Sequence, residues 1–287
     1  MSSTDTLFVN LGSRRYQLER PWGRPLPGTP LGLCSGVAVD SKDRVYVYQR
    51  FDTLVQKEPV PAILVFDAEG NHIASWAEQV RDAHHIFIDK RDRVLLVDRD
   101  SHQILVFDTG GTLLFTLGNR DRPGEPFNHP TGVSVGPEGD IYVADGYGGC
   151  HVHRFSPEGA LVSTWGSPGD GPGQFSTPHS VWVAATGDVY VADRENNRVQ
   201  IFDPTGVYLN QISGLYKPMS IYMDAAGEIY VSDQIPRLTT FASSGKRLGA
   251  CRPVMYGGHC VFGDSKNNLY LAEISPSRIT KLRLVNN

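Results

Sequence analysis

Hydrophobic and polar positions alternate along short stretches of this chain, and the same pattern recurs six times. Each copy has an alternating apolar run, a turn of Asp, Gly, Asn or Lys, and a second alternating run. The six copies read SGVAVDSKDRVYVY, HHIFIDKRDRVLLVD, TGVSVGPEGDIYVAD, HSVWVAATGDVYVAD, MSIYMDAAGEIYVSD and HCVFGDSKNNLYLAE. Alternation with a period of two on both sides of a turn indicates a β-hairpin. The chain is therefore predicted to be all-β.

The spacing of the copies predicts the architecture. The residues that enter the turns mark the register: Asp40, Asp89, Gly136, Ala184, Asp224 and Asp264. They follow one another at intervals of 49, 47, 48, 40 and 40 residues, which leaves room for a third and a fourth strand. The third strand carries phrases such as ILVFD and VQIFD, and the fourth has a tryptophan or leucine near its end. Four-stranded repeats of this length are typical of propeller blades.

The chain is predicted to be one domain, a six-bladed β-propeller closed by an N-terminal strand. The blades are expected near residues 33–77, 83–118, 127–166, 175–213, 216–250 and 256–287. The last range has sequence for only three strands. The segment RRYQLE, Arg14 to Glu19, precedes the first copy and reads as an unpaired strand. We expect it to complete the last blade, because a closed ring leaves few strand edges unpaired.

Composition narrows the function classes. With 27 Lys and Arg against 31 Asp and Glu, the 287-residue chain has a formal net charge of -4, so no nucleic-acid partner is expected. Residues 1–10 are polar and predict neither a secretory signal nor a membrane span. The four cysteines are irregularly spaced and form no Cys-x-x-Cys pair: Cys34, Cys150, Cys251 and Cys260. A reducing cytoplasmic setting is the expectation.

One repeat position carries most of the candidate chemistry. Five residues before each register mark, at the start of the innermost strand, stand Ser35, His84, Thr131, His179, Met219 and His259. Histidines in alternate blades are related by turns of about 120°, so they should converge on the central channel. Three converging imidazoles predict an open metal site, with water or substrate in the next position.

A structural role is the alternative for any single histidine at a strand start, and the threefold repetition favours the ligand interpretation. His85, next to His84, would be the ligand if the strand register differed by one residue, but strand alternation predicts that His85 points to the opposite side from His84. The remaining histidines lack the repetition and are interpreted as surface or packing residues: His72, His102, His129, His151 and His153.

A second set of residues follows the second strand of four blades. It comprises Arg50, Arg99, Tyr147 and Arg194. In a propeller the end of the second strand adjoins the start of the first, so these side chains are expected near the histidines. The alternatives are an ion pair of Arg194 with Glu195 and a packing role for Tyr147. The proximity to the predicted metal keeps a functional role open.

The phrases ADGYGGCHVHRFSPEGALVSTWG, GPGQFSTPHSVWV and VYVADRENNRVQIF resemble NHL-repeat propellers, and among them the catalytic domain of peptidyl-α-hydroxyglycine α-amidating lyase. The resemblance runs from about Val45 to the end of the chain and is most specific between Phe127 and Phe202. It implies that His84, His179 and His259 bind zinc or another divalent transition metal. It also implies that Tyr147 is the catalytic tyrosine and that Arg50 and Arg194 are the active-site arginines.

The sequence departs from this family at three positions. Gly148 and Ile201 stand where the family has disulfide-forming cysteines, which agrees with a reducing compartment. Cys260 stands where the family has an aspartate that helps to hold a structural calcium ion, so that Ca²⁺ is in doubt. No copper monooxygenase domain is expected from these 287 residues, which leaves the acyl part of the substrate open.

The resemblance implies a lyase that splits an N-acyl α-hydroxyglycine-like hemiaminal into an amide and glyoxylate. Tyr147 would act as the general base, and Arg50 or Arg194 would bind the carboxylate of this small anionic substrate. One alternative is a zinc-dependent hydrolase of an ester, lactone or amide, because the same histidines serve that chemistry. The other is a non-catalytic NHL interaction scaffold.

Overall fold

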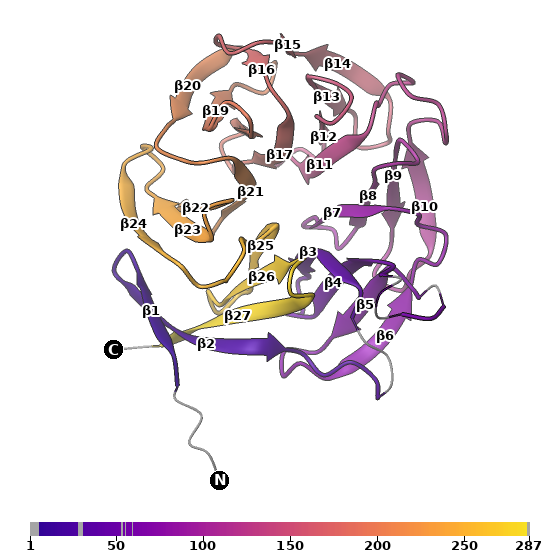
Figure 1. The fold of residues 1–287 in the computed structure, drawn as a ribbon. Helices are drawn as coiled ribbons and strands as arrows, with labels where there is room; N and C mark the ends of the chain where they lie inside the picture. Colours follow the sequence, from indigo (N-terminus) through magenta and orange to yellow (C-terminus); the bar gives the residue numbers. More distant parts are fainter. Residues whose placement is uncertain (1–5, 28–30, 53, 55, 59, 286–287) are drawn as a thin grey trace.

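The computed structural model describes residues 6–27, 31–52, 54, 56–58 and 60–285. Within these residues every regular element is a β-strand, and the strands form six blades around a central channel (Figure 1). Each blade is an antiparallel sheet whose first strand lies innermost. This is the predicted six-bladed propeller.

Blades 1 to 3 follow the chain order. Their strands are β3 (Leu33–Val39), β4 (Val45–Arg50), β5 (Ile63–Phe66), β6 (His72–Trp76), β7 (Ala83–Ile88), β8 (Val94–Asp98), β9 (Gln103–Phe107), β10 (Leu113–Leu117), β11 (Pro130–Val135), β12 (Ile141–Asp145), β13 (His151–Phe155) and β14 (Leu161–Trp165). A short parallel pair, β15 (Ser167–Pro168) and β16 (Gln174–Phe175), lies between blades 3 and 4 in the chain.

Blades 4 to 6 continue the ring. Their strands are β17 (Pro178–Val183), β18 (Val189–Asp193), β19 (Arg198–Phe202), β20 (Tyr208–Ile212), β21 (Pro218–Met223), β22 (Ile229–Asp233), β23 (Arg237–Phe241), β24 (Arg247–Cys251), β25 (Cys260–Gly263), β26 (Leu269–Glu273) and β27 (Arg278–Val285). Residues 286 and 287 of the last predicted blade lie outside the described part of the chain.

The register marks correspond to a turn that repeats around the ring. The Asp40 carboxylate accepts hydrogen bonds from the amides of Lys42 and Arg44, both at 2.9 Å, and so closes the hairpin between β3 and β4. Asp89, Asp224 and Asp264 accept from the same two relative positions. A side chain that caps its own turn in this way explains why aspartate recurs there.

The core lies between neighbouring blades. At the end of the fourth strand of blade 1, Trp76 packs against Phe107 of blade 2, with ring centroids 5.1 Å apart. Trp165 of blade 3 meets Phe202 of blade 4 in the same way, at 6.1 Å. The tryptophan near the end of each of these repeats therefore packs one blade on the next, and this fixes the positions of the innermost strands around the channel.

The N-terminal strand closes the ring, as predicted. Strand β2 (Arg14–Trp22) pairs antiparallel with β27, so the last blade contains strands from both ends of the chain (Figure 1). The strand extends beyond the predicted Glu19, and Trp22 packs against Phe66 of blade 1 at 5.9 Å. A further strand that the sequence analysis missed, β1 (Phe8–Leu11), pairs with the outer edge of β2.

The described part of the chain contains no helix with the length and apolar character needed to cross a membrane. All four cysteines lie within it, and none of them forms a disulfide.

Three aromatic rings meet across the channel below the predicted histidine site. Phe87, Trp182 and Phe262 each stand three residues after one of the three histidines, in the same alternate blades. Their ring centroids lie 5.5 to 6.2 Å apart. A cavity of about 790 Å³ opens on the far side of these rings, lined by turns such as Asp89–Arg91 and Ala184–Thr186. The histidines do not line it.

Candidate metal centre

A backbone irregularity presents the repeat position to the channel. In blades 1 to 5 the pairing of the first two strands shifts by one residue, and the residues skipped are Ser35, His84, Thr131, His179 and Met219. Such a β-bulge takes one residue out of the ladder and redirects its side chain. In blade 6, His259 immediately precedes β25, and its amide donates to the carbonyl of Ala272 at 2.8 Å.

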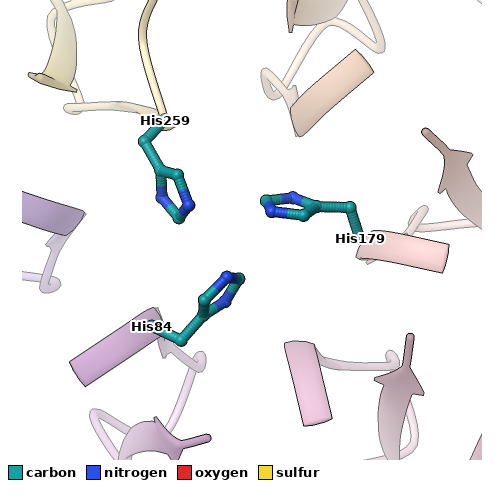
Figure 2. A group of neighbouring side chains, drawn as sticks. All are labelled: His84, His179 and His259. Carbon is teal, nitrogen blue, oxygen red and sulfur yellow. The ribbon is translucent and has the colours of Figure 1, made fainter. Parts of the chain in front are cut away.

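The three histidines converge as predicted from the repeat. One ligand atom from each of His84, His179 and His259 lies within 4.8 Å of the others, and the ring centroids are 4.9, 4.9 and 5.1 Å apart. Figure 2 shows the rings entering from three sides and facing a shared centre. All three side chains are buried.

A backbone carbonyl from the next blade orients each ring. Nδ1 of His84 donates to the carbonyl of Thr131 at 2.6 Å, and Nδ1 of His179 donates to Met219 at 2.7 Å. Nδ1 of His259 donates to the carbonyl of Ser35 at 2.6 Å. A carbonyl oxygen only accepts, so Nδ1 carries the proton and Nε2 keeps its lone pair. The non-histidine residues of the repeat position thus fix the tautomer with a free Nε2, an arrangement that is usual around metal-ligating histidines.

Burial keeps these imidazoles neutral. It lowers the pKa of His84 and His179 well below 6.5, and it lowers the pKa of His259 to about 3. The positive charge of Arg50 adds to the effect at His259. Neutral imidazole is the ligand form, so no proton has to be displaced near neutral pH when a divalent metal binds.

The lowered pKa values predict a stability that depends on pH in the metal-free protein. The unfolded chain protonates each histidine below pH 6.5, whereas folded His259 stays neutral down to about pH 3, so stability falls as the pH drops through that window. Between pH 6.5 and 5 we expect His259 alone to contribute a loss of about 2 kcal/mol. Urea unfolding of wild type and His259→Gln at both pH values measures this difference. An identical pH dependence of the two proteins would contradict the lowered pKa of His259 in the folded protein.

Tyr147 brings a phenol oxygen to the histidines. It follows β12, and its Oη lies 3.2 Å from Nε2 of His84 and 3.3 Å from Nε2 of His179. The preceding residue must be glycine, because a Cβ at Gly146 would lie 2.1 Å from the carbonyl oxygen of Pro178. The tyrosine loop is therefore packed directly on the strand that carries His179.

The two arginines singled out in the sequence lie beside this oxygen and the histidines. Nη1 of Arg194 donates to Tyr147 Oη at 3.2 Å, while its Nε binds Glu195 at 2.9 Å. The ion-pair alternative for Arg194 is thus present together with the contact to Tyr147. Nε of Arg50 donates to the carbonyl of Ala83 at 2.6 Å. Burial lowers the pKa of Arg50, and the nearby carboxylate of Asp82 counteracts that effect.

Other candidates lie around the site without joining the cluster. His85 is buried, and burial lowers its pKa to about 4, but it is not one of the three clustered ligands. His102 and His129 meet edge to face, with ring centroids 4.3 Å apart. Nε2 of His153 lies 3.6 Å from a carboxylate oxygen of Asp145. His102, His129 and His153 thus have ring or carboxylate contacts outside the cluster.

A small groove lies beside the histidines on blades 5 and 6. It has a volume of about 240 Å³, and residues that line it include Met219, Gln234, Tyr256, His259 and Ile274. Tyr147 and the two arginines come from blades 1, 3 and 4. The site therefore has a cationic side and a less polar side, with the three imidazoles between them.

The repeated motif defines the class of protein. The NHL repeat family matches residues 127–155 and 175–202, which cover most of blades 3 and 4. The chain thus carries NHL repeats within a six-bladed β-propeller, as its sequence predicted.

Curated proteins with related sequences include both enzymes and a repeat protein. The chain is 29% identical over 170 residues to peptidyl-alpha-hydroxyglycine alpha-amidating lyase 1 of Drosophila melanogaster, covering 51% of this chain and 31% of the fly protein. It is 34% identical over 179 residues to peptidylglycine alpha-amidating monooxygenase of Rattus norvegicus, covering 53% of this chain and 18% of the rat protein. NHL repeat-containing protein 3 of Homo sapiens is 29% identical over 93% of this chain and 83% of its own length.

Solved structures with the same fold include two lyases. A streptogramin B lyase superposes with a TM-score of 0.68 at 12% identity, covering 94% of this chain and 98% of that one. Virginiamycin B lyase from Staphylococcus aureus has a TM-score of 0.64 at 15% identity, with coverage of 95% and 90%. At these identities the likeness establishes the fold alone.

Proposed function

We propose that this protein is a metal-dependent carbon–nitrogen lyase that converts an N-acyl α-hydroxyglycine-like hemiaminal into an amide and glyoxylate. The observation that carries the proposal is the position of Tyr147 Oη, within 3.3 Å of two clustered imidazole nitrogens and 3.2 Å from Arg194. The similarity to amidating lyases supports the same reaction class.

The three histidines fit a divalent metal. Their Nε2 atoms face one centre, their Nδ1 atoms are held by carbonyls, and burial keeps them neutral. Three nitrogen donors with an open side are typical of catalytic zinc, so zinc is the metal that we propose. Such a metal would supply Lewis-acid chemistry, which stabilises negative charge on an oxygen.

Tyr147 is proposed to move the proton of the substrate hydroxyl. Its deprotonated Oη would accept that proton, and the electron pair of the O–H bond would form the C=O bond of glyoxylate. The C–N bond then breaks, its electron pair stays on the amide nitrogen, and that nitrogen takes up the proton held by Tyr147, which restores the deprotonated Oη. The guanidinium of Arg194, which already donates to Oη, would stabilise negative charge on the phenol oxygen.

The arginines are proposed to hold the substrate carboxylate. Among the described residues, Nε of Arg50 is engaged by Ala83 and Asp82, whereas no hydrogen-bond partner is present at either of its Nη atoms. A guanidinium with two free Nη groups suits a bidentate carboxylate contact. The acyl part would then lie across the histidines, in the groove with Met219 and Ile274. The substrate would therefore be a small anion with an apolar acyl group.

The proposed setting is a reducing compartment such as the cytoplasm. All four cysteines are free, including buried Cys34 and Cys260, and burial raises the pKa of Cys260 to about 11. Such thiols are inert to oxidation, because the reactive form is the thiolate.

Product analysis tests the reaction class. Metal-loaded protein is incubated with α-hydroxyhippurate, and benzamide and glyoxylate are quantified together. We expect equal amounts of both products and loss of the activity with a chelator. The hydrolase alternative predicts faster turnover of a neutral ester or lactone and no glyoxylate. The scaffold alternative predicts turnover of neither, so either outcome would replace the lyase assignment.

The planar contact of Arg194 predicts the effect of a conservative change. Arg194→Lys should lower kcat/KM for α-hydroxyhippurate about tenfold to hundredfold, because an ammonium cannot bind Glu195, Tyr147 and a carboxylate in one plane. Steady-state kinetics measure it. Arg93→Lys is the matched control, since Arg93 forms an ion pair with Asp89 at the opposite mouth of the channel. Equal kinetics of Arg194→Lys and wild type would remove Arg194 from the site.

A further inference from the structure

Two guanidinium groups lie over the ring of Tyr147. The central carbon of Arg194 is 5.2 Å from the ring centroid, and that of Arg99 is 5.3 Å from it. The contact with Arg194 belongs to the proposed catalytic site, because Arg194 also reaches the phenol oxygen. In the described part of the chain Arg99 forms no hydrogen bond with the histidines or with Tyr147 Oη, and it meets Tyr147 at the face of the ring. A guanidinium over an aromatic face stabilises the position of that ring.

Arg99 and Arg50 share one buried carboxylate. Nε of Arg99 lies 2.7 Å from Oδ2 of Asp82, and Nε of Arg50 lies 3.1 Å from Oδ1 of the same residue. Asp82 stands two residues before His84, immediately before β7. Its backbone is fixed as well, because its amide donates to Asp98 at 3.0 Å. The carboxylate therefore links the two arginines through ion pairs.

The charge around Arg99 argues against a direct role in binding the substrate carboxylate. Its Nε also lies 2.8 Å from Oδ1 of Asp100, so two carboxylates already surround this guanidinium. Arg50 differs, since Asp82 is its single ion-pair partner in the described residues and its Nη atoms are unbonded. An anion approaching the site would be attracted by Arg50 and repelled by Asp100.

We propose that Asp82 and Arg99 are positioning residues. Arg99 holds the ring of Tyr147 so that Oη stays within hydrogen-bond distance of His84 and His179, and Asp82 fixes Arg99 and Arg50 relative to each other. The proposal rests on the proposed function, since it assigns these residues to the proton-transfer step and to carboxylate binding. It adds two residues that touch neither the clustered imidazoles nor, on this account, the substrate.

The two residues predict different kinetic signatures. Arg99→Met keeps the length of the side chain and removes its charge, so kcat for α-hydroxyhippurate should fall about tenfold while KM stays within about twofold. Asp82→Asn frees both arginines, so it should lower kcat and also raise KM severalfold. A rise in KM without a fall in kcat for Arg99→Met would show that Arg99 binds substrate directly, and it would overturn the proposal.

A double-mutant cycle separates positioning from general structural damage. If Arg99 acts through the phenol oxygen, Arg99→Met should change kcat less than twofold in a Tyr147→Phe background, where that oxygen is absent. A tenfold loss in both backgrounds would refute the proposal. Arg81→Met is the control, because the side chain of Arg81 forms an exposed ion pair with Asp121 at 2.8 Å and, among the described residues, no ion pair with Asp82 and no contact with the ring of Tyr147.

A crystal structure of Arg99→Met provides a readout that does not depend on turnover. We expect Tyr147 Oη to lie beyond hydrogen-bond distance of His84 and His179, with the three histidines unmoved. An unchanged Tyr147 would overturn the positioning role even if the enzyme is active. Absence of glyoxylate with wild-type protein, combined with a displaced Tyr147 in the variant, would instead reject the proposed reaction and leave the positioning role standing.

Discussion

Tyr147→Phe is expected to lower kcat for α-hydroxyhippurate cleavage by about 10²- to 10⁴-fold, with KM changed by no more than about threefold. The substitution removes the oxygen that lies between His84, His179 and Arg194, and it leaves the ring under both guanidinium groups. Binding of the carboxylate and of the acyl group should therefore persist, whereas the proton acceptor is lost. Steady-state kinetics with glyoxylate detection measure both constants.

The matched control for this variant is Tyr216→Phe. Tyr216 is 47% exposed, comparable to the 40% of Tyr147, and its hydroxyl group makes no hydrogen bond with the described residues. It should leave kcat and KM unchanged. If Tyr147→Phe retained more than about a third of the wild-type kcat, Tyr147 would not be the general base, and another group would have to take the hydroxyl proton.

Removal of residues 1–20 is expected to lower the melting temperature by about 6–12 °C. The deletion takes away β1 and most of β2, and with them Leu11 and Tyr16, both almost fully buried. Losing two such side chains costs about 3–6 kcal/mol, and each kcal/mol shifts the melting temperature of a domain of this size by about 2 °C. The deletion also exposes the edge of β27. Differential scanning calorimetry measures the shift.

A shorter deletion is the control for this experiment. Removing residues 1–5 leaves both N-terminal strands intact and should not change the melting temperature. The ion pair of Arg14 with Asp224 of blade 5, at 2.8 Å, is lost only in the longer deletion. An unchanged melting temperature after removal of residues 1–20 would contradict a ring that depends on its N-terminal strand.

The fold could be predicted from the sequence because each repeat carries its own local signals. Alternation specifies the strands, and turn residues such as Asp40 and Asp264 mark the hairpins through hydrogen bonds within a few residues. The closing strand could be inferred from the missing fourth strand of the last blade. β1 was missed because FVNL is only four residues long and lies outside the six repeats, so no repeated pattern reveals it.

The convergence of the histidines could also be predicted, since it follows from symmetry. The backbone feature that turns them toward the channel could not be predicted. It is a β-bulge at His84 and His179, which depends on how two strands pair and does not change the alternation of apolar and polar residues within one strand. The carbonyls that orient the rings are backbone atoms of Ser35, Thr131 and Met219. Any residue type offers such a carbonyl, so the sequence carries no signal for them.

The ion pairs that join Arg50, Asp82 and Arg99 could not be predicted from the sequence. The three residues come from two blades, and their contacts depend on side-chain rotamers across the blade interface. Sequence spacing identified Arg50 and Arg99 as residues after a second strand, but it could not show that one carboxylate joins them. For Arg194 the sequence offered an ion pair with Glu195, and the structure shows this ion pair together with a hydrogen bond to Tyr147 Oη.

Metal content is the most direct test of the central claim, that His84, His179 and His259 form a metal site on which the reaction depends. Protein purified without chelators is analysed by inductively coupled plasma mass spectrometry, together with the triple alanine variant of these histidines. A triple alanine variant of His102, His129 and His151, which lie outside the cluster, is the control. The account predicts about one zinc or other divalent transition-metal ion per chain in wild type and control, and none in the cluster variant. Full metal occupancy in the cluster variant, with its fold intact, would contradict it.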